Sequence, residues 1–176
     1  MRKVVESTFV TLDGRISEPQ NWSGPYWDDE HSAYADKLME PADALLLGRA
    51  TYEVFADSWP GRPGDLADKM NRMPKHVASR TLTDTTWNAS LLGDDVPAAV
   101  AELKAQEGGD ILKYGTGSLD HALMEHELVD EFHFWFFPVL AGSGDSLIDG
   151  IEPTHLKLAD TSTFESGIVV NVYEPK

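Results

Sequence analysis

The chain has 176 residues, of which 41% are hydrophobic and 25% charged, so length and composition fit a single globular domain over residues 1–176. A formal net charge of -16 argues against binding to nucleic acid or to an anionic membrane surface. The sequence contains no cysteine, which excludes disulfides, thiolate metal sites and cysteine nucleophiles. We see no signal peptide and no run long enough to span a bilayer, and we expect a cytoplasmic protein.

Strand and helix patterns alternate along the chain with short connections between them. This alternation predicts an α/β fold of three layers, with a mostly parallel central sheet, helices on both faces and an antiparallel C-terminal hairpin. In chain order, the predicted elements are a strand over 3–12, a helix from 28 to about 39, a strand over 43–47, a helix from 48 to about 59, strands over 75–79 and 87–91, a helix over 96–106, a strand over 110–114, a helix over 119–127, a strand over 131–139 and the hairpin from 155.

Three loops that follow predicted strands have the chemistry to bind phosphate. They are Gly48-Arg49-Ala50-Thr51, Ser79-Arg80-Thr81 and Gly115-Thr116-Gly117-Ser118. In open α/β sheets, ligands bind at the carboxyl ends of the strands, where glycines and helix N-termini present backbone N–H groups to anions. Two of only six arginines lie in these loops of an acidic chain. We interpret Arg49 and Arg80 as a site for the 2′-phosphate of NADPH.

Other interpretations of these motifs stay open. Each loop alone also fits ordinary turn chemistry, and Asp120 stands where a dinucleotide fingerprint would have its third glycine. The chain has neither a Walker A sequence nor a G-x-S-x-G elbow, which argues against an NTPase and a serine hydrolase of that type. His121 with Glu125, and His126 with Asp130, are spaced four apart, but no third ligand is evident, so we expect no metal.

The loop over residues 17–27 and the start of the first helix carry further candidates. Trp22 is equally interpretable as a packing residue or as a lid over a nicotinamide or substrate, whereas Trp27, Trp59 and Trp135 are expected to be packing residues. Capping is the simplest role for the three acids at 28–30. The alternative is that one of them, with Asp29 as our candidate, protonates or orients a substrate.

Taken in order, these motifs resemble the dihydrofolate-reductase-like superfamily. The resemblance is closest to stand-alone proteins similar to the reductase domain of the bacterial bifunctional riboflavin-biosynthesis deaminase/reductase, and it covers nearly the whole chain. The segments that carry it are Leu12-Asp13-Gly14 with Ile16-Ser17, Trp22, residues 43–53 (DALLLGRATYE), 79–82 (SRTL), 115–119 (GTGSL), 128–131 (LVDE) and 138–144 (PVLAGSG).

This resemblance implies hydride transfer from NADPH to a C=N or C=O bond in a pterin-like or ribosylaminopyrimidine-like substrate. The residues implied for the cofactor are Gly48, Arg49 and Thr51 at the pyrophosphate and 2′-phosphate, Ser79, Arg80 and Thr81 at the adenosine end, Gly115, Thr116, Gly117, Ser118 and Leu119 around the pyrophosphate, and Val10, beside Phe9, with Trp22 at the nicotinamide. The zinc deaminase motifs are absent. The acid that dihydrofolate reductases carry on the first helix falls nearest Ser32 in register.

Two other classes of function are open, and so is the state of assembly. The chain could be a nucleotide- or pterin-binding protein that keeps the NADPH site without turnover, or a structural oligomerising domain. We also expect a homodimer built around the strand over 131–139, because His133, Trp135 and Phe137 share one face and such aromatic faces suit subunit contacts. The alternative is a central strand that helices cover on both faces.

Overall fold

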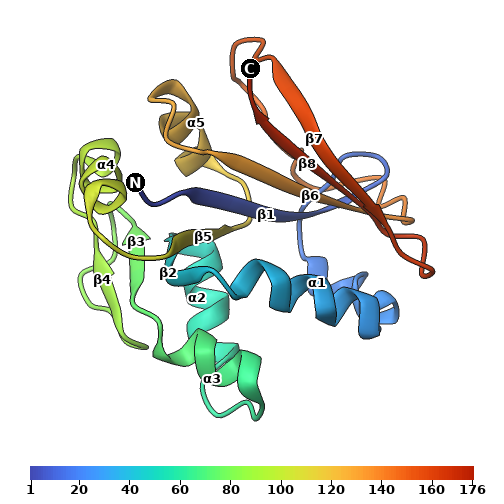
Figure 1. Ribbon diagram of the computed structural model, residues 1–176, viewed down its shortest axis with the longest axis horizontal. Coiled ribbons are helices and arrows are strands. Elements are labelled where there is room, and N and C mark those ends of the chain that lie inside the picture. The colour runs from blue at the N-terminus through green and yellow to red at the C-terminus, as the bar shows by residue number, and fades with distance from the viewer.

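A computed structural model describes residues 1–176 as one eight-stranded sheet with helices packed on both faces (Figure 1). The strand order is β4-β3-β2-β5-β1-β6-β8-β7. Strands β1 to β6 pair in parallel, and β8 runs antiparallel to both β6 and β7. The α/β fold class expected from the sequence is therefore confirmed, including its antiparallel C-terminal hairpin.

The element bounds agree with the sequence prediction except at one helix. Nothing was predicted over residues 62–74, where α3 forms; this helix is short and mostly polar and buries only Ala67 and Met70. No helix is long and apolar enough to cross a membrane. The strands are β1 (Val4–Thr11), β2 (Ala42–Gly48), β3 (Lys75–Ala78), β4 (Ala89–Leu91), β5 (Asp110–Tyr114), β6 (Glu131–Phe137), β7 (Leu156–Thr163) and β8 (Val169–Pro175). The helices are α1 (Asp29–Met39), α2 (Arg49–Ser58), α3 (Asp65–Arg72), α4 (Val96–Ala105) and α5 (Ser118–Glu125), with short 3-10 turns η1 (Pro19–Asn21) and η2 (Gly24–Tyr26).

Successive residues of the central strands belong alternately to two separate hydrophobic layers, one on each face of the sheet. In β2, Leu45 and Leu47 belong to a cluster of 16 buried residues packed with α1, α2 and α3. Leu46, between them, belongs to a cluster of 11 buried residues packed with α4 and α5. Successive strand residues point to opposite faces, so a continuous apolar run requires a cover on each side.

Helix α1 covers the face of β6 that we expected to form a subunit contact. Trp135 is 1% exposed and Phe137 is fully buried. The hydroxyl of Tyr34 on α1 lies 2.9 Å from Nδ1 of His133, and the Tyr34 ring meets Trp135 edge to face at 4.9 Å between centroids. The predicted dimer contact on this face is therefore wrong: β6 is a central strand buried on both sides.

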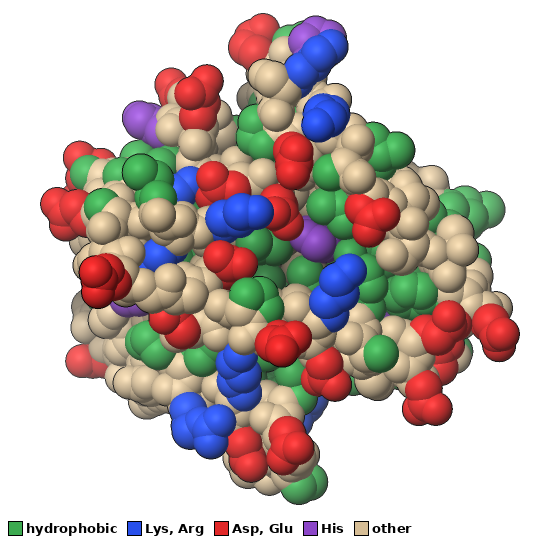
Figure 2. Space-filling view, viewed as in Figure 1, with side chains coloured by type: hydrophobic (Ala, Val, Ile, Leu, Met, Phe, Trp, Pro, Cys, Tyr) green, Lys and Arg blue, Asp and Glu red, His purple; other side chains and the backbone are tan.

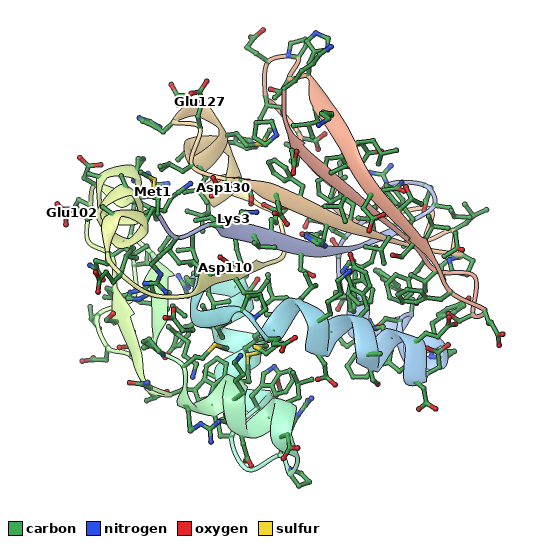
Figure 3. The ribbon with its side chains drawn as sticks, in the orientation of Figure 1. Met1, Lys3, Glu102, Asp110, Glu127 and Asp130 are labelled. Atoms are coloured by element: carbon green, nitrogen blue, oxygen red, sulfur yellow. The ribbon has the colours of Figure 1, made fainter.

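Ion pairs close the amino-terminal edge of the sheet. Arg2 pairs with Asp43 at the start of β2. Lys104 of α4 lies 2.5 Å from Oδ2 of Asp130, which also accepts the backbone N–H of Val4 at 2.7 Å. Figure 3 shows Asp130 beside Lys3, near the start of β1 and β6. These contacts hold the first residues of the strands in place. The opposite edge, where the parallel strands end, carries the connecting loops.

Candidate functional site

Four loops lie in a row at the carboxyl edge of the sheet. They follow β3, β2, β5 and β1, which are consecutive in the strand order and all parallel. Three strand spacings of about 4.8 Å place the outermost two loops roughly 14 Å apart. The structure thus brings together the three phosphate-type loops predicted from the sequence, with the end of β1 beside them.

Two of these loops are joined through Arg49. It is the first residue of α2, directly after β2, and its guanidinium donates to the hydroxyl of Thr81 in the loop after β3. The same guanidinium lies 2.9 Å from Oε1 of Glu53, and the Arg49 side chain is half exposed. Ser79 orders its own loop by accepting the N–H groups of Thr81 and Leu82, and Arg80 is exposed beside it. Two accessible guanidinium groups therefore sit at neighbouring strand ends.

The third loop packs against the first. Gly115 has a φ of 74°, and a Cβ atom built on it would lie 3.2 Å from the hydroxyl of Thr51, so glycine serves both the conformation and the close approach. Gly117 is extended, with nothing within 4 Å of its Cβ position. The hydroxyl of Thr116 donates to the carbonyl of Leu147. Helix α5 begins at Ser118, so the loop leads from β5 directly into a helix N-terminus.

A buried charge cluster that the sequence analysis missed holds this third loop. Glu6 of β1 and Lys113 of β5 are register partners, and their charged groups approach to 3.5 Å. Nζ of Lys113 lies 2.6 Å from Oδ1 of Asp120 on α5 and donates to the carbonyl of Gly115 at 2.5 Å. Oδ2 of Asp120 accepts the N–H of Gly117 at 2.6 Å. The cluster thus forms hydrogen bonds with the backbone of both glycines of the turn.

The protonation of this cluster follows from its burial. Burial raises the pKa of Glu6 well above its usual value, and Asp120 raises it further, while Lys113 opposes the shift. Burial lowers the pKa of Lys113, but attraction to Glu6 and Asp120 more than reverses that effect. A neutral Glu6 beside a Lys113–Asp120 ion pair leaves no net charge in the interior, which is the least costly arrangement.

The residues predicted at the nicotinamide end lie around β1 and β6. Val10 is fully buried in the layer beneath α5, whereas its neighbour Phe9 is only partly buried on the opposite face. Trp22 donates its indole N–H to the carbonyl of Ser17 at 3.0 Å and packs edge to face on Phe137 at 5.2 Å. Trp22 is thus a packing residue at the carboxyl end of β6, and its role as a lid stays a prediction.

A carboxylate fastens the loop after β1 to the loop after β6. Asp13 accepts the hydroxyl of Thr11 at 2.6 Å and the backbone N–H groups of Ala141 and Gly142 at 2.9 and 2.7 Å. These hydrogen bonds, with that from Thr11 largest, lower the pKa of Asp13. Two of the sequence segments that carry the family resemblance are therefore joined directly in space.

Helix α1 begins as predicted, and the structure places its acids at the surface. Asp28 is the N-cap and accepts the N–H of His31 at 2.8 Å. Asp29 is exposed, and its predicted role in protonation stays a prediction. The buried ionisable side chain of this first turn is His31, which is 5% exposed. Trp27, expected to be a packing residue, stacks on the His31 imidazole at 4.9 Å between ring centroids and is 56% exposed at the surface.

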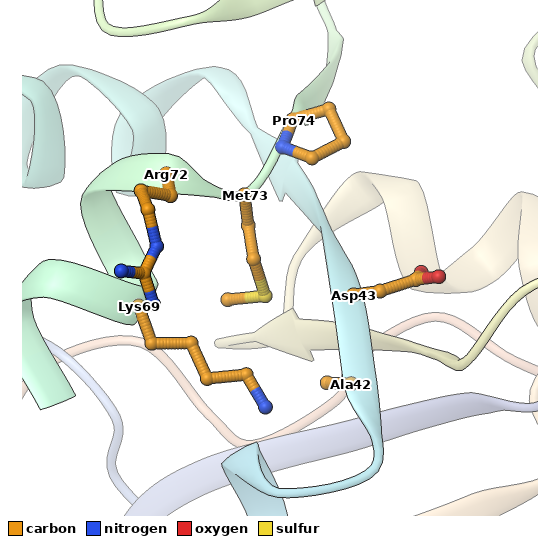
Figure 4. Close-up of a pocket in the computed structure, with 6 residues that line it drawn as sticks. All are labelled: Ala42, Asp43, Lys69, Arg72, Met73 and Pro74. Carbon is orange, nitrogen blue, oxygen red and sulfur yellow. The ribbon is translucent and has the colours of Figure 1, made fainter. Parts of the chain in front are cut away.

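A pocket at the amino edge of the sheet is lined in part by charged groups that hold the fold together. A pocket of about 290 Å³ lies between the start of β2 and the end of α3, lined by Ala42, Asp43, Lys69, Arg72, Met73 and Pro74 (Figure 4). There Lys69 donates to the last carbonyls of α1, and Asp43 pairs with Arg2. In Figure 2, acidic side chains spread over much of the visible face, and a histidine lies in a hollow between α1 and the strands. We therefore place the candidate site at the carboxyl edge.

Comparison with known families decides what kind of domain this is. The sequence matches the family of the RibD C-terminal domain over residues 2–170. The chain belongs to this family. It is 31% identical over 178 residues to the uncharacterized protein YyaP of Bacillus subtilis, with 98% of this chain and 94% of YyaP covered.

Solved structures support the same assignment at the level of the fold. A riboflavin-biosynthesis protein from Shewanella superposes with a TM-score of 0.77 and 21% identity, over 99% of both chains. A Thermotoga maritima diaminohydroxyphosphoribosylaminopyrimidine deaminase/5-amino-6-(5-phosphoribosylamino)uracil reductase superposes with a TM-score of 0.67 and 14% identity, over 99% of this chain and 57% of that one. The resemblance recognised in the sequence is thus confirmed: the chain is a RibD C-terminal domain with the fold of riboflavin-biosynthesis reductase domains.

Replacing Lys113 by Met should destabilise this domain by about 3–5 kcal/mol at pH 7, because Asp120 and Glu6 would lose their buried cation. Urea unfolding measures the loss. Lys3→Met, which removes a more exposed ion pair with Glu131, is the control and should cost less than about 1 kcal/mol. The stability lost in Lys113→Met should become smaller as the pH falls. Buried carboxyls left without a cation bind protons more readily in the folded than in the unfolded variant, so protonation stabilises the folded variant. Equal effects of the two variants would contradict the cluster's role.

Proposed function

We propose that the protein is an NADPH-dependent reductase whose cofactor lies along the carboxyl edge of the sheet. The observation that carries the proposal is the unbroken row of loops after β3, β2, β5 and β1, with two accessible arginines at one end. A row about 14 Å wide suits an extended dinucleotide. Membership of a reductase-like family supports the same conclusion.

Each part of the row has a separate task in this proposal. Arg49 and Arg80 pair with the 2′-phosphate, and for this Arg49 exchanges its contacts with Glu53 and Thr81 for the ligand. The turn at Gly117 and the start of α5 hold the pyrophosphate, since the space at the Gly117 Cβ position is empty and the first N–H groups of a helix attract an anion. Bound NADPH would supply a hydride to the substrate. Phe9 and Trp22 would shield the reacting rings from water.

The substrate that we propose is a small pterin-like or ribosylaminopyrimidine-like molecule, reduced at a C=N or C=O bond. A structural relative is named as a 5-amino-6-(5-phosphoribosylamino)uracil reductase, which supports this class. NADPH oxidation, followed by absorbance with dihydrofolate, a dihydropterin and a ribosylaminopyrimidine, tests turnover. Binding of NADPH without oxidation in any of these assays would favour the second candidate, a binding protein that keeps the cofactor site. A cytoplasmic location also stays a proposal.

Arg49→Ala should weaken NADPH binding by about 1.5–3 kcal/mol and NADH binding by much less, because only NADPH carries the 2′-phosphate. Calorimetric titration of both cofactors measures the difference. Arg72→Ala is a matched control, since Arg72 is an exposed arginine on α3 outside the row of loops. Equal losses of NADPH and NADH affinity in Arg49→Ala would refute the assignment of the phosphate site.

Gly117→Val should abolish NADPH binding while the protein stays folded. The backbone of Gly117 is extended and the space at its Cβ position is empty, so a valine side chain fits the free protein but fills the place proposed for the pyrophosphate. Gly117→Ala should give a smaller loss. Thermal unfolding checks the fold and titration checks binding. Unchanged NADPH affinity in folded Gly117→Val would place the cofactor elsewhere.

We also propose a homodimer, on a surface other than the buried face of β6. Strand β7 ends the sheet, and its outer backbone groups have no neighbouring strand. Leu158 on this strand is 53% exposed, and exposed edge strands favour pairing with another chain. Light scattering at increasing micromolar concentration should give the dimer mass for the wild type and a lower mass for Leu158→Lys. A monomer mass at all concentrations would refute the dimer.

A further inference from the structure

His31 carries a buried polar atom that nothing in the protein satisfies. The residue is 5% exposed, and its Nε2 atom has no hydrogen-bond partner. Such atoms are rare in folded proteins, because burying an unpaired polar group is destabilising. The unpaired carboxylate oxygens of Glu6 and Asp120 face the cation of Lys113, so the charge cluster accounts for them. No such cation or donor accounts for His31.

Aromatic rings surround this imidazole on three sides. Phe9 lies edge-on to the imidazole at 5.6 Å between centroids, and Trp135 is tilted against it at 5.0 Å. Phe9 and Trp135 are register partners on β1 and β6. Trp27 stacks over the imidazole at 4.9 Å with an interplanar angle of 19°. Because Trp27 is 56% exposed, it is the cover that separates His31 from solvent. The three rings form an aromatic box around the His31 imidazole.

One wall of this box, Phe9, lies next to the nicotinamide end of the proposed cofactor site. Phe9, which forms one wall, also contacts Phe137 at 4.8 Å, and Phe137 contacts Trp22 at 5.2 Å. Phe9 keeps some exposed surface although it lies on a central strand. A ring placed against Phe9 would therefore lie beside the carboxyl end of β1, where the reactive end of the cofactor is proposed.

The imidazole is held in place and uncharged. The side chain of Asp28 fixes the His31 backbone by accepting its N–H at 2.8 Å. Burial lowers the pKa of His31, and Asp28 opposes that shift only in part. A neutral imidazole nitrogen donates or accepts a single hydrogen bond, according to its tautomer. Such a nitrogen is suited to the N–H or C=O edge of an uncharged heteroaromatic ring.

We propose that Nε2 of His31 hydrogen-bonds the polar edge of the substrate's flat ring, which enters beside Phe9 when Trp27 moves aside. This inference rests on the proposed reductase function and deepens it: the substrate is a planar nitrogen heterocycle with an N–H or C=O edge, such as a pterin or an aminopyrimidine. His31 becomes the residue that selects this edge. It acts by recognition in the ground state, with no proton transfer required of it.

Replacement by Phe and by Gln tests this role. His31→Phe removes the unpaired nitrogen but keeps an aromatic ring, so it should melt at or above the wild-type temperature. Its affinity for dihydrofolate, a dihydropterin or a ribosylaminopyrimidine, titrated in the presence of NADPH, should fall at least about tenfold. NADPH affinity should not change. His31→Gln, which keeps a hydrogen-bonding group, should recover part of the lost affinity.

The outcomes separate this inference from the function on which it rests. A folded His31→Phe that binds the three probes as tightly as the wild type would overturn the inference. A wild type that binds NADPH but none of the probes would overturn it as well. A wild type that binds a probe in a His31-dependent way but never binds NADPH would refute the reductase proposal alone. If His31→Phe does not fold, the same comparison is made with His31→Gln, whose affinity should lie below that of the wild type.

Discussion

The carboxyl edge of this protein depends on one buried cation. Lys113 crosses from β5 to meet Glu6 on β1 and Asp120 on α5, and it also holds the carbonyl of Gly115. Without it, two carboxyl groups would share an apolar interior. Because the same contacts fix the turn before α5, the core and the proposed pyrophosphate site share a single set of interactions. A disturbance of the cluster would thus reach the site without any change in the loops themselves.

The amino and carboxyl edges of the sheet have different roles. At the amino edge, Arg2, Lys104 and Asp130 fasten strand starts to neighbouring elements. At the carboxyl edge, the side chains of Arg49 and Arg80 are exposed, and the space at the Cβ position of Gly117 is empty. This division is typical of parallel α/β sheets, in which loops at the carboxyl ends of the strands bind ligands.

Sequence periodicity predicted most elements and the three loops, because short apolar strands bounded by glycine, proline and acidic residues are local signals. It missed α3, which is short and mostly polar, and the Glu6–Lys113 pairing, which depends on register between strands distant in sequence. It placed a subunit contact on Trp135 because a strand with two apolar faces fits either a core or an interface. It overlooked His31 because its aromatic neighbours come from three separate segments.

The central claim is that the carboxyl edge is an NADPH site. The melting temperature of the wild-type protein at rising concentrations of NADPH tests this most directly, since a ligand that binds only the folded state stabilises it by RT ln(1 + [L]/Kd). The account predicts a rise in melting temperature that continues with the logarithm of NADPH concentration and is smaller at matched NADH concentrations. A melting temperature that neither cofactor changes, up to millimolar concentration, would contradict it.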